Sequence, residues 1–151
     1  MEAKASWKDA VSFSTTSGTG HTVVTDGPAD SGGLNRGPRP MELLLMGTGA
    51  CAAYDVLLIL QKGRQRVTNC DAHVKAERAD DVPSVFTTLH IHFTVSGEDL
   101  SERKVARAVD LSADKYCSAS IMLARSGARV THSYEIVPQP AGADGTDTDE
   151  G

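Results

Sequence analysis

The sequence predicts one mixed domain in which pairs of strands alternate with helices, and three observations carry this prediction. Residues 40–62 form a long apolar segment that opens with a proline and ends before Gly63. Residues 86–96 alternate apolar and polar side chains, as in a strand with one buried face. Glycine- and proline-rich stretches separate the segments. A chain of 151 residues suffices for one core.

The first two predicted strands, residues 5–16 and 21–26, form a hairpin. Residues that favour strands flank a glycine-rich tip at positions 17–20. Residues 27–39 follow with four glycines and two prolines, and we expect a loop there. This loop is long for a compact domain, and long ordered loops are often functional.

The predicted helix begins at Pro40, where the missing N–H costs nothing, and Glu42 lies in its first turn, where the helix dipole favours an anion. It should run to about Lys62. Because it is apolar on nearly every side, we expect other elements to surround it. Gly47 and Asp55 are among the residues that interrupt its apolar run, so a core helix is a better interpretation than a membrane span.

The second half begins with predicted strands over 67–78 and 86–96, joined by residues 80–84. A helix capped by Ser101 follows, with a break near residues 112–116. A short helix then ends at Gly127, and a last strand covers residues 128–137. The domain is therefore residues 1–137, and residues 138–151 are expected to be a disordered acidic tail.

Charge and composition limit the function. The formal net charge is −5, but the tail carries −4 of it, so the domain is nearly neutral. The sequence contains no basic stripe interleaved with aromatic residues, so it does not indicate nucleic-acid binding.

The N-terminus lacks the features of a secretory signal, which predicts a cytoplasmic protein. With three cysteines we expect reduced or reactive thiols instead of a disulfide framework. Aromatic residues are few, so extra burial in a dimer is plausible.

The three cysteines have different surroundings. Cys51 lies inside the apolar helix, where a thiol is more often a small hydrophobe than a catalyst. Cys117 lies near the start of the short helix, where free N–H groups and the dipole favour a thiolate. Cys70 reads as a buried thiol on a strand. Cys70 with His73, or His90 with His92, gives only two metal ligands without a second pair, so no metal is predicted.

Two segments together resemble the OsmC/Ohr family. They are "PMELLLMGTGACAAYDVLLIL" and, sixty-odd residues later, "VARAVDLSADKYCSASIML"; the stretch "RAVDLSADKYCS" is most similar to the YhfA-like subgroup. The intervening "FTTLHIHFTVSG" and the closing "THSYEIV" add to the likeness. It extends from about residue 5 to residue 137, in order and without large gaps.

The resemblance implies an α+β fold, with antiparallel sheets around a long central buried helix and two subunits intertwined as a homodimer. It implies a cysteine-based thiol peroxidase that protects against oxidative stress by reducing organic hydroperoxides or hydrogen peroxide. Cys51 would become a sulfenic acid, Cys117 would condense with it to a disulfide, and a dithiol or thiol reductant would restore the pair. No cofactor is implied, and neither a nucleic acid nor a membrane is an expected partner.

Two supporting residues of the family are not in their usual places. A glutamate usually follows the opening proline, but here Met41 does, and Glu42 comes one place later. Glu42 lies about 180° around the helix from Cys51, so it faces away on a straight helix. The family also has an arginine on the N-terminal hairpin. The candidates here are His21, Arg36 and Arg39.

Asp55 follows Cys51 by one helical turn and projects from the same side. An unpaired carboxylate there would raise the pKa of the thiol. We therefore expect Asp55 to have a cationic or hydrogen-bonding partner, within the site or across a dimer.

Two alternatives to the peroxidase remain. One is an OsmC-like protein that binds a small hydrophobic ligand or a partner, and the other is a structural module whose cysteines are core residues.

Overall fold

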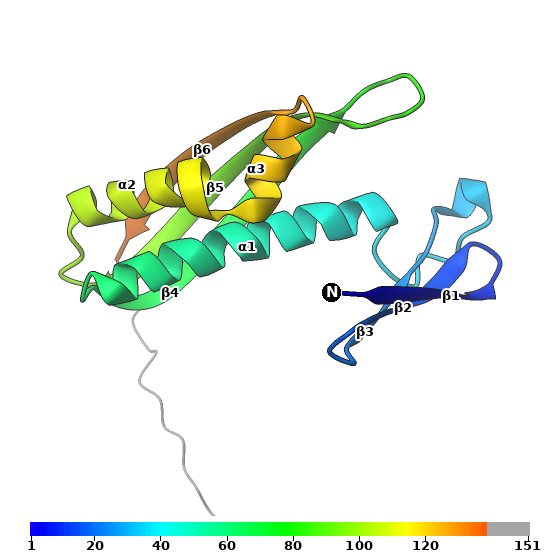
Figure 1. Cartoon of the computed structure of the whole chain (residues 1–151), viewed down its shortest axis with the longest axis horizontal. Helices are drawn as coiled ribbons and strands as arrows, with labels where there is room; N and C mark the ends of the chain where they lie inside the picture. Colours follow the sequence, from blue (N-terminus) through cyan, green and yellow to red (C-terminus); the bar gives the residue numbers. More distant parts are fainter. Residues whose placement is uncertain (139–151) are drawn as a thin grey trace, which may run out of the picture. The chain divides into compact units, whose positions relative to one another are not determined.

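The computed structural model describes residues 1–138, which fall into two compact units, residues 1–47 and the part that begins at Thr48 (Figure 1). The predicted mixture of strands and helices is confirmed, with two three-stranded sheets and three α-helices in the described residues. The predicted acidic tail, apart from Pro138, lies outside the described residues.

The first unit contains an antiparallel sheet of β1 (Ala3–Asp9), β2 (Ser12–Ser17) and β3 (Thr22–Thr25), in that order. The predicted single strand over 5–16 is therefore wrong. The chain reverses at Ala10, which has a φ of 43°, so this turn uses a left-handed residue without the glycine that usually marks one. The second reversal, between β2 and β3, lies at the predicted glycine-rich tip.

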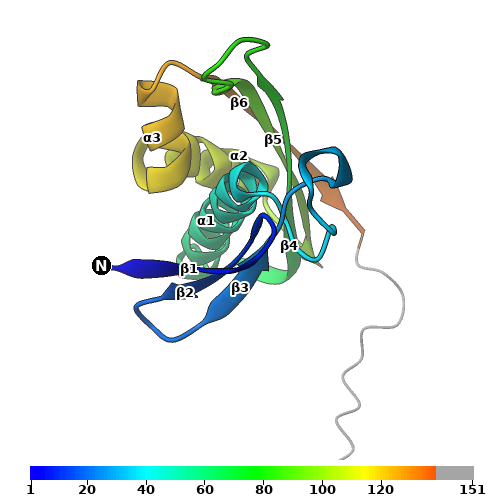
Figure 2. The same cartoon turned by 90° about the vertical axis from the view of Figure 1, so that its right-hand side faces the viewer.

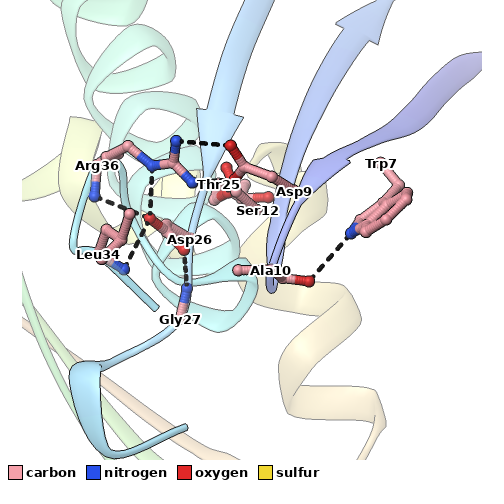
Figure 3. A network of polar contacts seen from close by, with 9 residues as sticks. All are labelled: Trp7, Asp9, Ala10, Ser12, Thr25, Asp26, Gly27, Leu34 and Arg36. Atoms are coloured by element: carbon pink, nitrogen blue, oxygen red, sulfur yellow. Dashed lines mark hydrogen bonds and ion pairs between the residues drawn. The ribbon is translucent and has the colours of Figure 1, made fainter. Parts of the chain in front are cut away.

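The loop after β3 is ordered around one buried carboxylate (Figure 3). Asp26 accepts hydrogen bonds from the backbone N–H groups of Gly27, Leu34 and Arg36, at 2.8, 3.2 and 3.1 Å. The guanidinium of Arg36 also donates to Asp26 and to Asp9 on β1. These bonds lower the pKa of Asp26. The loop, which includes the short 3-10 helix η1 (Ala29–Ser31), is thus tied to the sheet of its own unit.

Helix α1 spans Pro40–Lys62, as predicted. The side chain of Glu42 accepts a hydrogen bond from the backbone N–H of Arg39 at 2.8 Å, which is one half of a capping box. At the other end the N–H of Gln65 donates to the carbonyl of Leu60, and Arg64 has a φ of 57°. At each end of the helix, a backbone hydrogen bond is therefore made with a residue close by in the sequence.

The second unit contains β4 (Arg66–Arg78), β5 (Phe86–Glu98) and β6 (Arg129–Val137), in that order. Strands β4 and β5 are antiparallel, but β6 is parallel to β5. The expectation of purely antiparallel sheets needs this one correction. The segment of α2 (Glu102–Leu111), η2 (Ser112–Tyr116) and α3 (Ser118–Arg125) returns the chain to the start of β5, and a crossover of this kind joins parallel strands.

The ends of these helical segments differ in part from prediction. Ser101 precedes α2, but its side chain makes no capping hydrogen bond; its carbonyl accepts from the N–H groups of Lys104 and Val105 instead. The predicted break is a π-helical turn, η2. Gly127, with a φ of 106°, follows α3 as predicted.

The core of the second unit lies between the sheet and the helices, which cover one face of the sheet (Figure 2). The predicted alternation in β5 is confirmed, because Leu89, Ile91, Phe93 and Val95 are buried while His90 and His92 face the other side and remain partly exposed. Cys117 also belongs to this core, and helices α1 and α2 supply its other members: Ala52, Val56, Leu60, Val105, Ala108 and Val109.

The described residues of one chain do not surround helix α1 completely, and the expected cover by a second subunit stays a prediction. Met46 and Tyr54 are 57% and 62% exposed, although Ala52, Val56 and Leu60 are fully buried. Among the described residues α1 is the one helix that is long and apolar enough to cross a bilayer. Its buried residues nevertheless belong to the core of the second unit, which is the position of a core helix in a folded domain.

Candidate functional site

Three side chains that could carry chemistry converge in the second unit. The sulfur atoms of Cys51 and Cys117 and a carboxylate oxygen of Asp55 all lie within 4.8 Å of one another. Cys51 and Cys117 are 66 positions apart in the sequence, so this proximity is a product of the fold. The two thiols therefore lie close to the distance at which a disulfide can form after a modest movement.

The surrounding elements fix these positions. Cys51 and Asp55 project from one side of α1 because they are one turn apart. Cys117 is the N-cap residue of α3 and follows directly after η2. The hydroxyl of Ser112, at the start of η2, donates to the carbonyl of Ala52 at 3.3 Å, and both residues are fully buried. This bond ties the segment that carries Cys117 to the turn of α1 that carries Cys51.

The two thiols differ in exposure. Cys117 is 0% exposed and belongs to the hydrophobic core, whereas Cys51 is only partly buried at its edge. A small molecule that approaches the site from solvent therefore meets Cys51 first. A reaction at Cys117 requires either prior reaction at Cys51 or an opening of the core.

Burial also opposes the ionisation of Cys117. It raises the pKa of the Cys117 thiol, although hydrogen bonding by Ser120 works in the opposite direction and favours the thiolate. The position of Cys117 at a helix start predicts a thiolate. That expectation needs correction, because the loss of hydration in the core outweighs the favourable helix terminus.

Asp55 has no partner within the described residues of one chain, and a partner across a dimer stays a prediction. One of its carboxylate oxygens, Oδ2, is buried and accepts no hydrogen bond, and Asp55 forms no ion pair with any described residue. Burial raises the pKa of this carboxyl above its usual value. At a given pH, more of this carboxyl is therefore in the neutral form than in an exposed aspartate.

Cys70 is not one of the converging groups. It lies on β4 facing α1, with its sulfur 3.9 Å from the carbonyl oxygen of Ala53, and burial raises its pKa to about 11. This fits a structural thiol. The imidazoles of His90 and His92 both contact the hydroxyl of Ser133, at 2.7 and 2.8 Å, so hydrogen bonds already occupy the pair that the sequence analysis discounted as a metal site.

The other predicted supporting residues lie in the first unit. Arg36 is engaged by Asp9 and Asp26, and Glu42 caps α1. Arg39 donates to the side-chain oxygen of Asn35. His21 contacts the hydroxyl of Thr19 at 3.1 Å and is exposed. Within their unit, Arg36 and Glu42 thus have structural partners, and their roles toward a substrate stay predictions.

Two serines at the site were missed by the sequence analysis. Ser120 is the third residue of α3, and a hydroxyl at that position could have been predicted to contact the N-cap Cys117. Ser112 gave no such signal, because its partner is a carbonyl of α1, 60 positions away.

Comparison with known proteins places this chain in a family. Residues 32–133 match the family described as OsmC-like protein. The chain is 46% identical to protein YhfA of Escherichia coli K12, over 91% of this chain and 98% of that protein. An OsmC-like protein from Mycoplasma pneumoniae has the same fold at 17% identity, with a TM-score of 0.77 over 90% of this chain and 96% of that one.

A further solved structure, from Legionella pneumophila, is that of an organic hydroperoxide resistance protein OsmC. It has a TM-score of 0.65 at 16% identity, over 89% of this chain and 95% of that one, which is a likeness of fold. The family match covers more than half of the sequence, and the identity to YhfA extends over nearly all of both chains. The chain therefore belongs to the OsmC-like protein family.

Proposed function

We propose that this protein is a cytoplasmic thiol peroxidase that reduces organic hydroperoxides or hydrogen peroxide through Cys51 and Cys117. The observation that carries the proposal is the convergence of both sulfur atoms and Asp55 within 4.8 Å. Two thiols that lie this close can be oxidised to a disulfide, which supplies the two electrons that a peroxide accepts. The unequal exposure of the thiols supports their assignment, because the substrate must reach the first thiol and not the second.

The first step takes place at Cys51. Its thiolate attacks one oxygen of the hydroperoxide ROOH, so that an S–O bond forms while the O–O bond breaks. The leaving alkoxide takes up a proton and departs as the alcohol, or as water when the substrate is hydrogen peroxide. Cys51 is then a sulfenic acid, and its sulfur has lost two electrons.

Asp55 is the proposed proton donor in that step. Its raised pKa keeps more of the carboxyl protonated than at an exposed site, and its buried oxygen is free of other partners among the described residues. It is the carboxyl group nearest to the thiols in the cluster. We propose that Asp55 supplies the carboxyl group of this site, because this chain has Met41 where the family pattern has a glutamate after the helix-opening proline.

The second step takes place at Cys117. Its sulfur attacks the sulfenic sulfur of Cys51, the S–S bond forms, and the hydroxide that leaves combines with the Cys117 proton to form water. Burial suits Cys117 to this role, since a thiol shielded from solvent reacts only with a partner already inside the site. An external dithiol then reduces the disulfide by thiol exchange.

The test is a stopped-flow assay of the reduced protein with cumene hydroperoxide and hydrogen peroxide. We expect Cys51→Ser to reduce peroxide consumption to the rate of an ordinary thiol, while Cys70→Ser retains the wild-type rate. Cys70 is the matched control because it is a partly buried thiol of the same unit, as Cys51 is, but lies outside the cluster. Mass spectrometry after one equivalent of peroxide should find a Cys51–Cys117 disulfide.

Two results would contradict the proposal: a wild-type protein no faster than a free thiol, or a stoichiometric disulfide that contains Cys70. Absence of turnover together with a tightly bound hydrophobic molecule would instead favour the alternative, an OsmC-like protein that binds a ligand. That alternative is motivated by the displaced glutamate and by the engagement of Arg36 with two carboxylates.

A further inference from the structure

The cluster of Cys51, Asp55 and Cys117 also has the composition and spacing of a cation site. Zinc binds thiolate sulfur at about 2.3 Å and carboxylate oxygen at about 2.0–2.2 Å, so the ligand atoms of a tetrahedral site lie about 3.5–3.8 Å apart. The three atoms here lie within 4.8 Å of one another. Side-chain adjustments of about 1 Å or less would therefore bring them to ligand distance.

The ligand positions rest on regular elements. Cys51 and Asp55 are separated by one turn of α1, the same spacing that lets two residues on one helix face share a zinc ion in other proteins. Cys117 is held at the junction of η2 and α3, and the bond from Ser112 to Ala52 links this junction to α1. Three ligands from two connected elements make a site that needs little ordering before it binds.

The unpartnered carboxyl oxygen of Asp55 gives a second observation. Oδ2 of Asp55 is buried without a hydrogen bond, and no cationic side chain among residues 1–138 forms an ion pair with Asp55. If both thiols and the carboxyl were ionised, three negative charges would lie within 4.8 Å of one another. A divalent cation bound by the two sulfurs and the carboxylate would compensate two of these charges and give Asp55 the partner that it lacks among the described residues.

We propose that in the reduced protein Cys51, Cys117 and Asp55 bind one thiophilic divalent cation, of which Zn²⁺ is the chemical type. Two sulfur ligands and one oxygen ligand favour zinc over Mg²⁺ or Ca²⁺, which prefer oxygen alone. Three protein ligands leave a fourth position for water. This inference goes beyond the proposed peroxidase and differs from the sequence analysis, which predicted no metal.

Metal binding and disulfide formation exclude each other in this arrangement. A disulfide brings the sulfurs to about 2.05 Å and removes both thiolates as ligands. Oxidation by a hydroperoxide would form the S–S bond from the two thiolates and break the O–O bond, giving an alkoxide and a hydroxide. The alkoxide would take a proton from water and leave as the alcohol, and the cation would be released, so bound metal protects the thiols until a peroxide reaches them.

The experiment titrates Zn²⁺ into the reduced full-length chain, freed of metal by a chelator and kept without oxygen, against a chromophoric zinc indicator. We expect one equivalent to bind to the wild type. Cys51→Ser and Asp55→Asn should each weaken binding by on the order of tenfold or more, while Cys70→Ser should bind like the wild type. Co²⁺ in place of Zn²⁺ should give the sulfur-to-metal charge-transfer absorption of thiolate ligands, and this absorption should vanish in the disulfide form.

The proposal is overturned if the wild type binds no equivalent more tightly than Asp55→Asn does, or if Cys70→Ser abolishes binding. Binding that persists in the oxidised protein would show an adventitious ion elsewhere on the chain. Cys117→Ser changes a core residue and the variant can fail to fold. In that case the binding measured for Cys51→Ser and Asp55→Asn decides whether the cluster binds the cation. Peroxide consumption is measured with chelator present, and zinc binding is measured without peroxide. The proposed peroxidase and the proposed cation site can therefore each fail independently of the other.

Discussion

At the scale of single residues, the site combines two thiols with a carboxyl group whose surroundings favour its neutral form. The raised pKa of Asp55 has a consequence for stability. Below about pH 4 the carboxyl is protonated in both the folded and the unfolded chain, so its burial causes no pH-dependent loss in the free energy of unfolding. As pH rises above that value the unfolded chain ionises first, so the folded state becomes relatively less stable until its own carboxyl has ionised.

We therefore predict that Asp55→Asn is more stable than the wild type at pH 7, and that this difference disappears toward pH 4. Urea unfolding of both proteins at several pH values, with chelator present, measures it. Asp71→Asn, which removes an exposed carboxylate of β4, is the control and should show no such difference. A wild type that is more stable than Asp55→Asn at pH 7 would mean that the ionised carboxylate has a partner in the folded protein.

The sequence analysis named all three residues of the cluster, but for reasons of unequal strength. The placement of Asp55 beside Cys51 follows from helical periodicity alone. The approach of Cys117 to Cys51 came from the family resemblance, because nothing local in the sequence brings positions 51 and 117 together. The burial of Cys117 was not predicted either: a helix start indicates free N–H groups but does not say what covers them.

At the scale of elements, local signals predicted well and non-local ones did not. Helix α1 begins and ends where Pro40 and Gly63 predict, since its caps involve only neighbouring residues. The turn at Ala10 was missed because it contains neither glycine nor proline. The parallel pairing of β6 with β5 could not be read from the alternation of side chains, which is the same in parallel and antiparallel pairs.

Strand β6 carries a histidine on the helix-covered face of its sheet. His132 pairs in register with Ile91, and its ring stacks on Phe93 with centroids 6.3 Å apart. One ring nitrogen, Nε2, is buried without a hydrogen bond. Burial lowers the pKa of His132, and His90 lowers it further, while Asp110 and Asp114 raise it by less. The folded protein thus prefers a neutral imidazole here.

We predict from this that the protein loses stability as pH falls below about 6.5, where the unfolded histidine takes up a proton that the folded one resists. His132→Gln should lose less stability than the wild type between about pH 7.5 and pH 5.5. Thermal unfolding across this range measures the difference, with the exposed His21→Gln as control. An equal pH dependence in the wild type and His132→Gln would show that His132 takes up a proton as readily in the folded protein.

At the scale of the whole molecule, large apolar side chains on α1 and α3 are exposed to solvent although neighbouring residues of α1 are in the core. Helix α1 contributes fully buried residues to one core and yet leaves Tyr54 62% exposed, and Met122 on α3 is equally exposed. Large exposed apolar side chains of this kind mark surfaces that bind other proteins. The family resemblance suggests the partner: a second copy of the chain, against which the exposed side of α1 would be covered.

We propose that the protein is a homodimer and predict that sedimentation velocity at micromolar concentration gives twice the mass of the chain. Tyr54→Lys should shift the protein toward single chains, because a charge buried in an apolar interface is costly. Leu34→Lys is the control: Leu34 is 67% exposed and apolar but lies on the loop before α1. A single-chain mass for the wild type, or a Tyr54→Lys variant that keeps the doubled mass, would exclude an interface at this side of α1.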